Sequence, residues 1–280
     1  MIKWVVIRWV AYSGFIGLLW LAGAAAWADD PIRISGTGAA TSVMKQVVEA
    51  YRQRHPDVEV RFHLPPMGSS GAIKAVGLNQ LDVALSGRPL KKEEESAGLV
   101  QQWLGRSPFL FVVHQDAPVS QISLDQLTEM YSGRQKAWPD GSRVRVILRP
   151  VADADTALLK SISPAMDEAV TYANSHRVHG SAMADTDIDL ADMVEKVPGA
   201  LGSVALTLVL AERRSLRGLV LDGSEPTVAA LKSGHYPYAK PLFLVTRAAA
   251  DAAVGGLTDF IRSATGQILL EQLGISITQP

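Results

Sequence analysis

Strand-like and helix-like segments alternate from residue 32 to the end of the chain, and this alternation restricts the possible fold most strongly. Residues 32–35 and 58–64 have strand patterns, while residues 41–53 place apolar side chains on one helical face. Strands that alternate with helices predict an α/β fold built on a parallel sheet. Further strands are expected at 81–85, 109–113, 144–148, 201–205, 218–221 and 242–245, and further helices at 68–78, 91–95, 123–131, 156–162, 189–197, 206–213, 227–232 and 257–273.

Small hydroxyl residues cluster at three points in the first part of this pattern. Gly36–Thr41 follows the first strand, Gly68–Gly71 opens the second helix, and Ser86–Leu90 follows the third strand. A helix start offers unpaired backbone N–H groups and the positive end of the helix dipole, and Ser or Thr adds hydroxyl donors without bulk. These segments therefore predict a convergent cradle for an oxyanion.

The first 28 residues have the pattern of a cleaved secretory signal. Lys3 and Arg8 precede an apolar run from Trp9 to Ala26, and small residues flank the expected cleavage point after Ala28. As a membrane anchor the run is marginal, because a spanning helix needs about 20 apolar residues and this run contains polar interruptions. We therefore expect a free periplasmic protein.

Composition excludes several classes of protein. The chain has no cysteine, which excludes a lipid-modified N-terminal cysteine, a disulfide framework and thiolate metal sites. Its formal net charge of −1 becomes −3 without the two basic residues of the signal, so no nucleic-acid partner is expected. The remaining length suffices for one large or two modest domains.

Two common glycine-rich motifs do not account for the helix starts. A dinucleotide-binding fingerprint at Gly36–Thr41 would need a third glycine and an acidic residue at the end of the next strand, which reads Phe62–Pro65 instead. Gly68–Gly71 lacks the Gly-x-Ser-x-Gly spacing of a hydrolase nucleophile elbow. The motifs supply no nucleophile, base and orienting acid, so we expect neither a cofactor nor catalysis.

A metal site is the alternative interpretation of one polar stretch. His176 and His179 lie near three aspartates at positions 185, 187 and 189. No regular element is expected there to hold the ligands, so solvated loop residues are the favoured interpretation.

Several motifs together resemble the periplasmic solute-binding proteins of phosphate-type ABC importers. In the order of that family, the chain carries the Gly36-Thr37-Gly38 segment, Gly68–Lys74, Leu81–Leu90, Tyr131–Trp138 and Tyr236–Leu242. The match spans nearly all of the chain after residue 28. It implies a two-lobed α/β fold of the type 2 periplasmic-binding class, with the ligand cleft between the lobes.

The resemblance also implies where the lobes divide. Lobe one would comprise residues 29–111 and 242–280, and lobe two residues 112–241, so that the chain crosses the hinge twice. Such proteins close over one anion, which suits ligand-driven hinge motion. We find no low-complexity linker, as expected for domains joined by continuous strands.

Family positions implied by the resemblance supply the candidate ligand residues. Hydroxyl and N–H groups can surround a tetrahedral anion, and an arginine adds a charged fork. The candidates are Thr37, Thr41, Ser69, Ser70, Ser86 and Arg88 from lobe one, and Arg149 and Thr156 from lobe two.

The chain departs from the family pattern at two places. Members commonly carry an aspartate in the third loop that accepts the proton of hydrogen phosphate, whereas Gly87 stands here. A Gly-Ser-Gly-Thr helix start in lobe two is replaced by Asp153-Ala154-Asp155-Thr156. Asp153 or Asp155 is therefore either the missing acceptor or a helix cap.

We expect a monomeric protein that binds inorganic phosphate, or a similar oxyanion, and delivers it to an ABC permease in the inner membrane. The alternative from another class is a protein of the same fold that senses the anion and signals to a membrane partner. Both interpretations require the same pocket.

Overall fold

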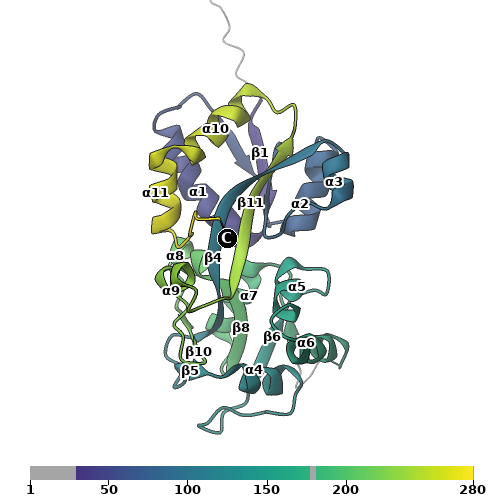
Figure 1. The fold of residues 1–280 in the computed structure, drawn as a ribbon, viewed down its shortest axis with the longest axis vertical. Coiled ribbons are helices and arrows are strands. Elements are labelled where there is room, and N and C mark those ends of the chain that lie inside the picture. The colour runs from purple at the N-terminus through teal and green to yellow at the C-terminus, as the bar shows by residue number, and fades with distance from the viewer. Residues whose placement is uncertain (1–29, 177–180, 280) are drawn as a thin grey trace, which may run out of the picture.

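The computed structural model describes residues 30–176 and 181–279. The predicted signal, residues 1–28, and His179 lie outside these ranges. Two lobes are stacked along the long axis of the molecule and are joined by two long strands (Figure 1). In the described residues, no helix combines the length and the hydropathy needed to cross a membrane.

Lobe one contains both the first and the last elements of the chain. Its strands follow the order β2-β1-β3-β11-β4. Helices α1, α10 and α11 enclose one core with the sheet, and α2 encloses another around Ala72 and Ile73. The bounds are β1 Ile32–Gly36, α1 Gly38–Arg52, β2 Val60–Phe62, α2 Gly68–Gly77, β3 Val83–Ser86, α3 Lys92–Ser96, β11 Ala239–Arg247, α10 Ala252–Arg262 and α11 Ala264–Gln272.

Lobe two repeats this layered arrangement with β8, β6 and β7 continuing from β4. One core contains Tyr131, Tyr236 and Phe109, and the core on the other sheet face contains Leu190 and Leu208. The bounds are β5 Gln121–Ile122, α4 Leu124–Tyr131, β6 Arg145–Leu148, α5 Ala154–Lys160, α6 Pro164–His176, β7 Ala182–Met183, α7 Asp187–Lys196, β8 Ala200–Ala205, α8 Leu206–Glu212, β9 Leu216–Gly218, β10 Val220–Leu221 and α9 Val228–Ser233.

The two crossing strands make the sheet mixed, so the expectation of a parallel sheet is wrong at its centre. β4 spans Leu99–His114 and runs antiparallel to β11. Its second half then pairs antiparallel with β8, while β1 pairs in parallel with β2 and β3. A chain that leaves a lobe and returns along the same hinge must reverse direction, and this requirement produces the antiparallel pair.

Several expected elements differ from the observed ones. The expected strand 109–113 is the second half of β4, and the expected helix 257–273 is two helices. Ser263 causes that break because its backbone is extended and its side chain accepts a hydrogen bond from the Gly266 N–H at the start of α11. Helix α6 was not expected at all.

Gly36 fits a position where two parallel strands approach too closely for any side chain. A Cβ atom there would lie 2.1 Å from the backbone oxygen of Leu85. Gly36→Ala should therefore lower the free energy of unfolding by at least about 1–3 kcal/mol, because the strand must shift. Gly255→Ala, in α10 with no atom within 4 Å of its Cβ, should instead stabilise the protein by about 0.5–1 kcal/mol. Urea unfolding of both variants tests this, and equal midpoints would contradict it.

Candidate functional site

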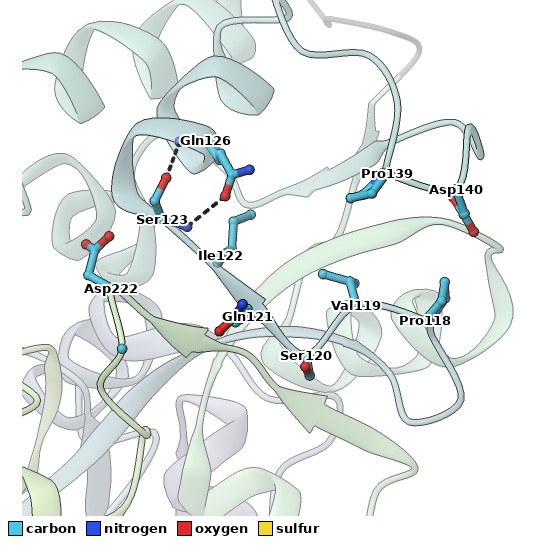
Figure 2. Close-up of a pocket in the computed structure, with 11 residues that line it drawn as sticks. Pro118, Val119, Ser120, Gln121, Ile122, Ser123, Gln126, Pro139, Asp140 and Asp222 are labelled. Atoms are coloured by element: carbon cyan, nitrogen blue, oxygen red, sulfur yellow. Dashed lines mark hydrogen bonds between the residues drawn. The ribbon is translucent and has the colours of Figure 1, made fainter.

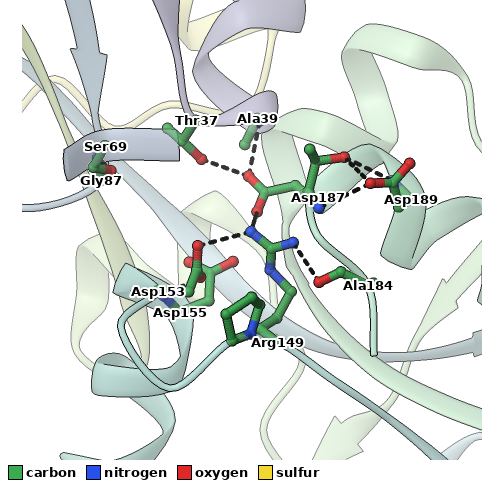
Figure 3. A network of polar contacts seen from close by, with 12 residues as sticks. Thr37, Ala39, Ser69, Gly87, Arg149, Asp153, Asp155, Ala184, Asp187 and Asp189 are labelled. Carbon is green, nitrogen blue, oxygen red and sulfur yellow. Dashed lines mark hydrogen bonds and ion pairs between the residues drawn. The ribbon is translucent and has the colours of Figure 1, made fainter. Parts of the chain in front are cut away.

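Charged and hydroxyl side chains from both lobes meet between them (Figure 3). Thr37 stands between β1 and α1 in lobe one, while Arg149 follows β6 in lobe two. Asp155 lies in the first turn of α5, Asp187 begins α7, and Lys240 comes from the crossing strand β11. All five side chains are almost completely buried, with at most 5% of each residue exposed.

The Asp187 carboxylate receives donors from lobe one and from the hinge. Its Oδ2 accepts hydrogen bonds from Thr37 Oγ1 at 2.6 Å, from the Ala39 N–H at 2.9 Å and from Lys240 Nζ at 3.0 Å. The Ala39 N–H belongs to the first turn of α1, where the helix leaves backbone donors unpaired and carries positive partial charge. These donors form a cradle for a carboxylate or another oxyanion.

Lys240 is the central cation of this cluster. Its Nζ lies 2.6 Å from Asp155 Oδ1 and 3.0 Å from Asp187 Oδ2, and it also donates to Thr37 Oγ1 at 3.1 Å. The lysine stem runs past Gly87, where an added Cβ would lie 2.7 Å from Lys240 Cε. Lys240 therefore occupies space next to the position where the resemblance implied an aspartate.

Arg149 supplies the second cation, from lobe two. Its Nη1 donates to the Ala184 carbonyl at 2.9 Å, and its Nη2 lies 2.7 Å from Asp153 and 3.5 Å from Asp187. In the described part of the chain, the Arg149 Nε has no hydrogen-bond partner. The guanidinium thus keeps one buried donor for a further acceptor.

Charge pairing offsets the desolvation of most of these groups. Burial opposes ionisation of Asp187, but Lys240 and Arg149 outweigh it and hold the pKa of this carboxyl well below its ordinary value. Burial likewise opposes the charged form of Lys240, whose pKa is nevertheless raised by Asp155 and Asp187. Both groups are therefore ionised at neutral pH.

Asp155 behaves differently from Asp187. Burial raises the pKa of Asp155 to about 8, with Asp187 and Asp153 acting in the same direction against Lys240. Its carboxyl group is therefore mainly protonated at neutral pH. Arg149 and Lys240 then lie beside one ionised carboxylate, that of Asp187, and one mainly neutral carboxyl group, that of Asp155.

Four of the sequence-predicted residues meet in this cluster, namely Thr37, Arg149, Asp153 and Asp155. Asp153 is the N-cap of α5, since its Oδ1 accepts from the Asp155 N–H at 2.9 Å while its Oδ2 pairs with Arg149. The capping interpretation is thus confirmed for Asp153. Asp155, by contrast, directs its carboxyl group to Lys240.

Three other predicted hydroxyls bond to nearby backbone. Thr41 Oγ1 donates to the Thr37 carbonyl inside α1, and Thr156 Oγ1 donates to the carbonyls at residues 149 and 150. Ser86 Oγ donates to the Arg88 carbonyl. These contacts stabilise the loops and helix starts around the cradle.

The remaining three candidates, Ser69, Ser70 and Arg88, form their hydrogen bonds within lobe one. Ser69 Oγ accepts from the Gly87 N–H at 2.9 Å, so it holds the third loop in place. Arg88 forms a two-point ion pair with Glu94 and donates to Ser70 Oγ. The structure therefore does not bring Arg88 to the Asp187 carboxylate that Arg149 approaches.

Sequence reasoning missed Lys240, Asp187 and the Ala39 N–H. Lys240 was noted only within a family motif, and Asp187 only as part of the possible metal stretch. Within the described residues, no group of three or more potential metal ligands is close enough to hold an ion. His176 stacks on Tyr172, one turn earlier in α6, with ring centroids 4.1 Å apart.

A separate groove lies on lobe two (Figure 2). It has a volume of about 720 Å³, and its walls include Ser123, Gln126 and Asp222. Ser123 and Gln126 form a reciprocal capping box at the start of α4, which confirms the cap expected there. The groove shares no residue with the charged cluster between the lobes.

Comparisons with known proteins identify a family and several relatives. The family model described as a PBP superfamily domain matches residues 23–265. The phosphate-binding protein PstS of Borreliella burgdorferi is 20% identical over 252 residues, covering 87% of this chain and 88% of that protein. PstS 2 of Streptococcus pneumoniae is 29% identical over 107 residues, and this match covers 38% of the chain and 36% of that protein.

Two solved structures share the fold. One, from Clostridium perfringens, holds phosphate and belongs to a candidate phosphate ABC transporter substrate-binding protein; it has a TM-score of 0.76 and 22% identity, covering 89% of this chain and all of the other. The other is an ABC-type phosphate transport receptor from Vibrio cholerae, with a TM-score of 0.62 and 20% identity over 89% of this chain and 100% of the other. These similarities confirm the two-lobed fold.

The raised pKa of Asp155 predicts a particular pH dependence of stability. The pKa rises from 3.8 to about 8 on folding, so between these values the folded protein holds more protons than the unfolded chain. Stability should therefore fall as pH rises, with a contribution of up to about 1.4 kcal/mol per pH unit. Asp155→Asn imitates the protonated form and should become more stable relative to the wild type between pH 5 and pH 8. Urea unfolding across this range tests the prediction, and parallel profiles for the two proteins would contradict it.

Proposed function

Because the chain belongs to the PBP superfamily, we propose that it is an extracytoplasmic binding protein for a tetrahedral oxyanion, with phosphate as the ligand. The observation that carries this proposal is a set of three donors, Thr37 Oγ1, the Ala39 N–H and Lys240 Nζ. They converge between the lobes on one anionic oxygen, Oδ2 of the buried Asp187 carboxylate. A hydroxyl, a helix-start amide and a cation are donors that an oxyanion accepts.

The ligand would lie where lobe one, lobe two and the hinge meet. Thr37 and Ala39 would bind it from lobe one, and Arg149 from lobe two, using the Nε that has no partner among the described residues. An anion held by donors from both lobes favours the closed arrangement of the hinge. This supports a clamp that closes on its ligand.

Asp155 is the group that we propose to recognise the proton of hydrogen phosphate. Asp153 is committed to the α5 cap and to Arg149, whereas Asp155 pairs with Lys240 through Oδ1 and its Oδ2 has no hydrogen-bond partner within the described residues. A carboxyl group can exchange a hydrogen bond with a protonated oxyanion in either of its own protonation states. Asp155 would take the role of the third-loop aspartate of the family, whose position is occupied by Gly87 in this chain.

We further propose that the protein is exported after cleavage behind Ala28, acts as a monomer and passes its ligand unchanged to an ABC permease. The names of its relatives support this role, because those proteins are phosphate-binding proteins and a phosphate transport receptor. Binding without reaction is consistent with a cluster made of ion pairs and hydrogen bonds.

A ligand panel tests the proposed function directly. The protein without residues 1–28, titrated in a calorimeter at pH 9 with phosphate, arsenate, sulfate and molybdate, should bind phosphate saturably and prefer it to sulfate. At this pH, above the pKa of Asp155, the ionised Asp155 carboxylate accepts a ligand proton that sulfate lacks. Equal binding of sulfate would contradict phosphate as the specific ligand. If none of the four anions binds, the proposed function is wrong.

Paired substitutions distinguish the two candidate arginines. Arg149→Lys keeps the buried charge but removes the fork, so phosphate affinity should fall about ten- to hundredfold, as expected from losing a charge-assisted hydrogen bond. Arg88→Lys is the matched control, because the structure engages Arg88 with Glu94. Its phosphate affinity should change less than about twofold. The assignment fails if the Arg88 variant loses affinity and the Arg149 variant does not.

A further inference from the structure

The Asp187 carboxylate occupies the donors that the proposed function assigns to the ligand. One oxygen takes the hydroxyl of Thr37, the amide of Ala39 and the ammonium of Lys240. The other oxygen lies 3.5 Å from Arg149. An oxyanion that used these same donors would have to take the place of this side chain (Figure 3).

The Asp187 side chain does not cap its own helix, so capping does not explain its position. Helix α7 begins with a reciprocal cap, in which Thr186 Oγ1 accepts from the Asp189 N–H at 3.0 Å and Asp189 Oδ2 accepts from the Thr186 N–H at 2.9 Å. This cap leaves the Asp187 side chain unused by the helix start. The carboxylate instead extends across to the first turn of α1 in the other lobe.

The backbone around this contact is closely packed. A Cβ atom on Gly38 would lie 3.2 Å from Asp187 Cβ and 3.2 Å from Ile188 Cγ1, so the first turns of α1 and α7 are in contact. Side-chain exposure of Asp187 and Lys240 is only 1% and 2%. A ligand therefore cannot enter while Asp187 remains in its present position.

We propose that Asp187 is an internal anion, which holds the empty protein closed and which an external oxyanion must displace from the cradle. The inference rests on the proposed function and specifies how its site is regulated. Asp187 would lower the apparent affinity, because the ligand binds only the fraction of molecules in which the cradle is free. It would also let ligands that outcompete a carboxylate bind in preference to weaker anions.

The internal anion makes two measurable predictions for Asp187→Asn, which keeps the side-chain shape and removes the charge. Without any added anion, small-angle scattering should show a larger radius of gyration than for the wild type, because a neutral residue 187 is held less strongly by Thr37 and the Ala39 N–H of lobe one and by Lys240 of the crossing strand. Calorimetric titration with inorganic phosphate should show at least about tenfold tighter binding than the wild type. Asp187→Ala should expand the empty protein in the same way.

Asp189→Asn is the matched control, with the same chemical change two residues away and outside the cradle. It should match the wild type in both measurements, and thermal unfolding of each variant checks that it is folded. If both Asp187 variants remain as compact as the wild type without anion, or if Asp187→Asn binds phosphate no more tightly than a binding-competent wild type, the inference is wrong. If no protein binds any oxyanion, the proposed function and displacement by a ligand both fail, and the scattering comparison then decides whether Asp187 holds the lobes closed. Phosphate binding by Asp187→Asn alone would support the internal anion and contradict a binding role for the wild type.

Discussion

The arrangement of the two lobes depends on a buried group of charges that neither lobe can balance alone. Lobe two contributes Arg149, Asp153, Asp155 and Asp187, the crossing strand contributes Lys240, and lobe one contributes Thr37 and the start of α1. Leaving a charge unpaired in a dry interior is strongly unfavourable, so the closed arrangement is stable only with all partners present. The proposed internal anion depends on the same condition, because displacing the Asp187 carboxylate would alter the charge balance that holds the lobes together.

Elements with strong periodicity could be predicted from the sequence, and so could the two-lobed fold. The apolar face of α1 and the buried run of β3 depend on local spacing, and the structure contains both. The length of β4 could not be predicted, because its first half is a crossing strand whose pattern is set by partners far away in sequence. α6 was missed because its buried positions are few and include two alanines.

The candidate site likewise contains residues that could be predicted from the sequence and residues that could not. Thr37 and Arg149 were predicted from the family resemblance, and each stands just after a strand, where the chain itself directs it to the sheet edge. Arg88 stands at a similar point, but a nearby glutamate engages it, and such a competition between two partners depends on geometry. Lys240 and Asp187 lie 53 residues apart in the chain and contact each other only because the lobes are folded together. In the sequence, Lys240 has apolar neighbours and is indistinguishable from a single solvent-facing polar residue of a strand.

The position of β11 inside lobe one has a consequence for how the chain folds during synthesis. β11 stands between β3 and β4 in the sheet, yet it begins at Ala239, so a ribosome must make most of the chain before lobe one can receive this internal strand. Until then, β3 and β4 present unpaired edges, and the loop that their partner must close is long. Lobe two, whose elements are continuous in sequence, can assemble first. Contacts of such high sequence separation form slowly, so lobe one completes its sheet late in folding.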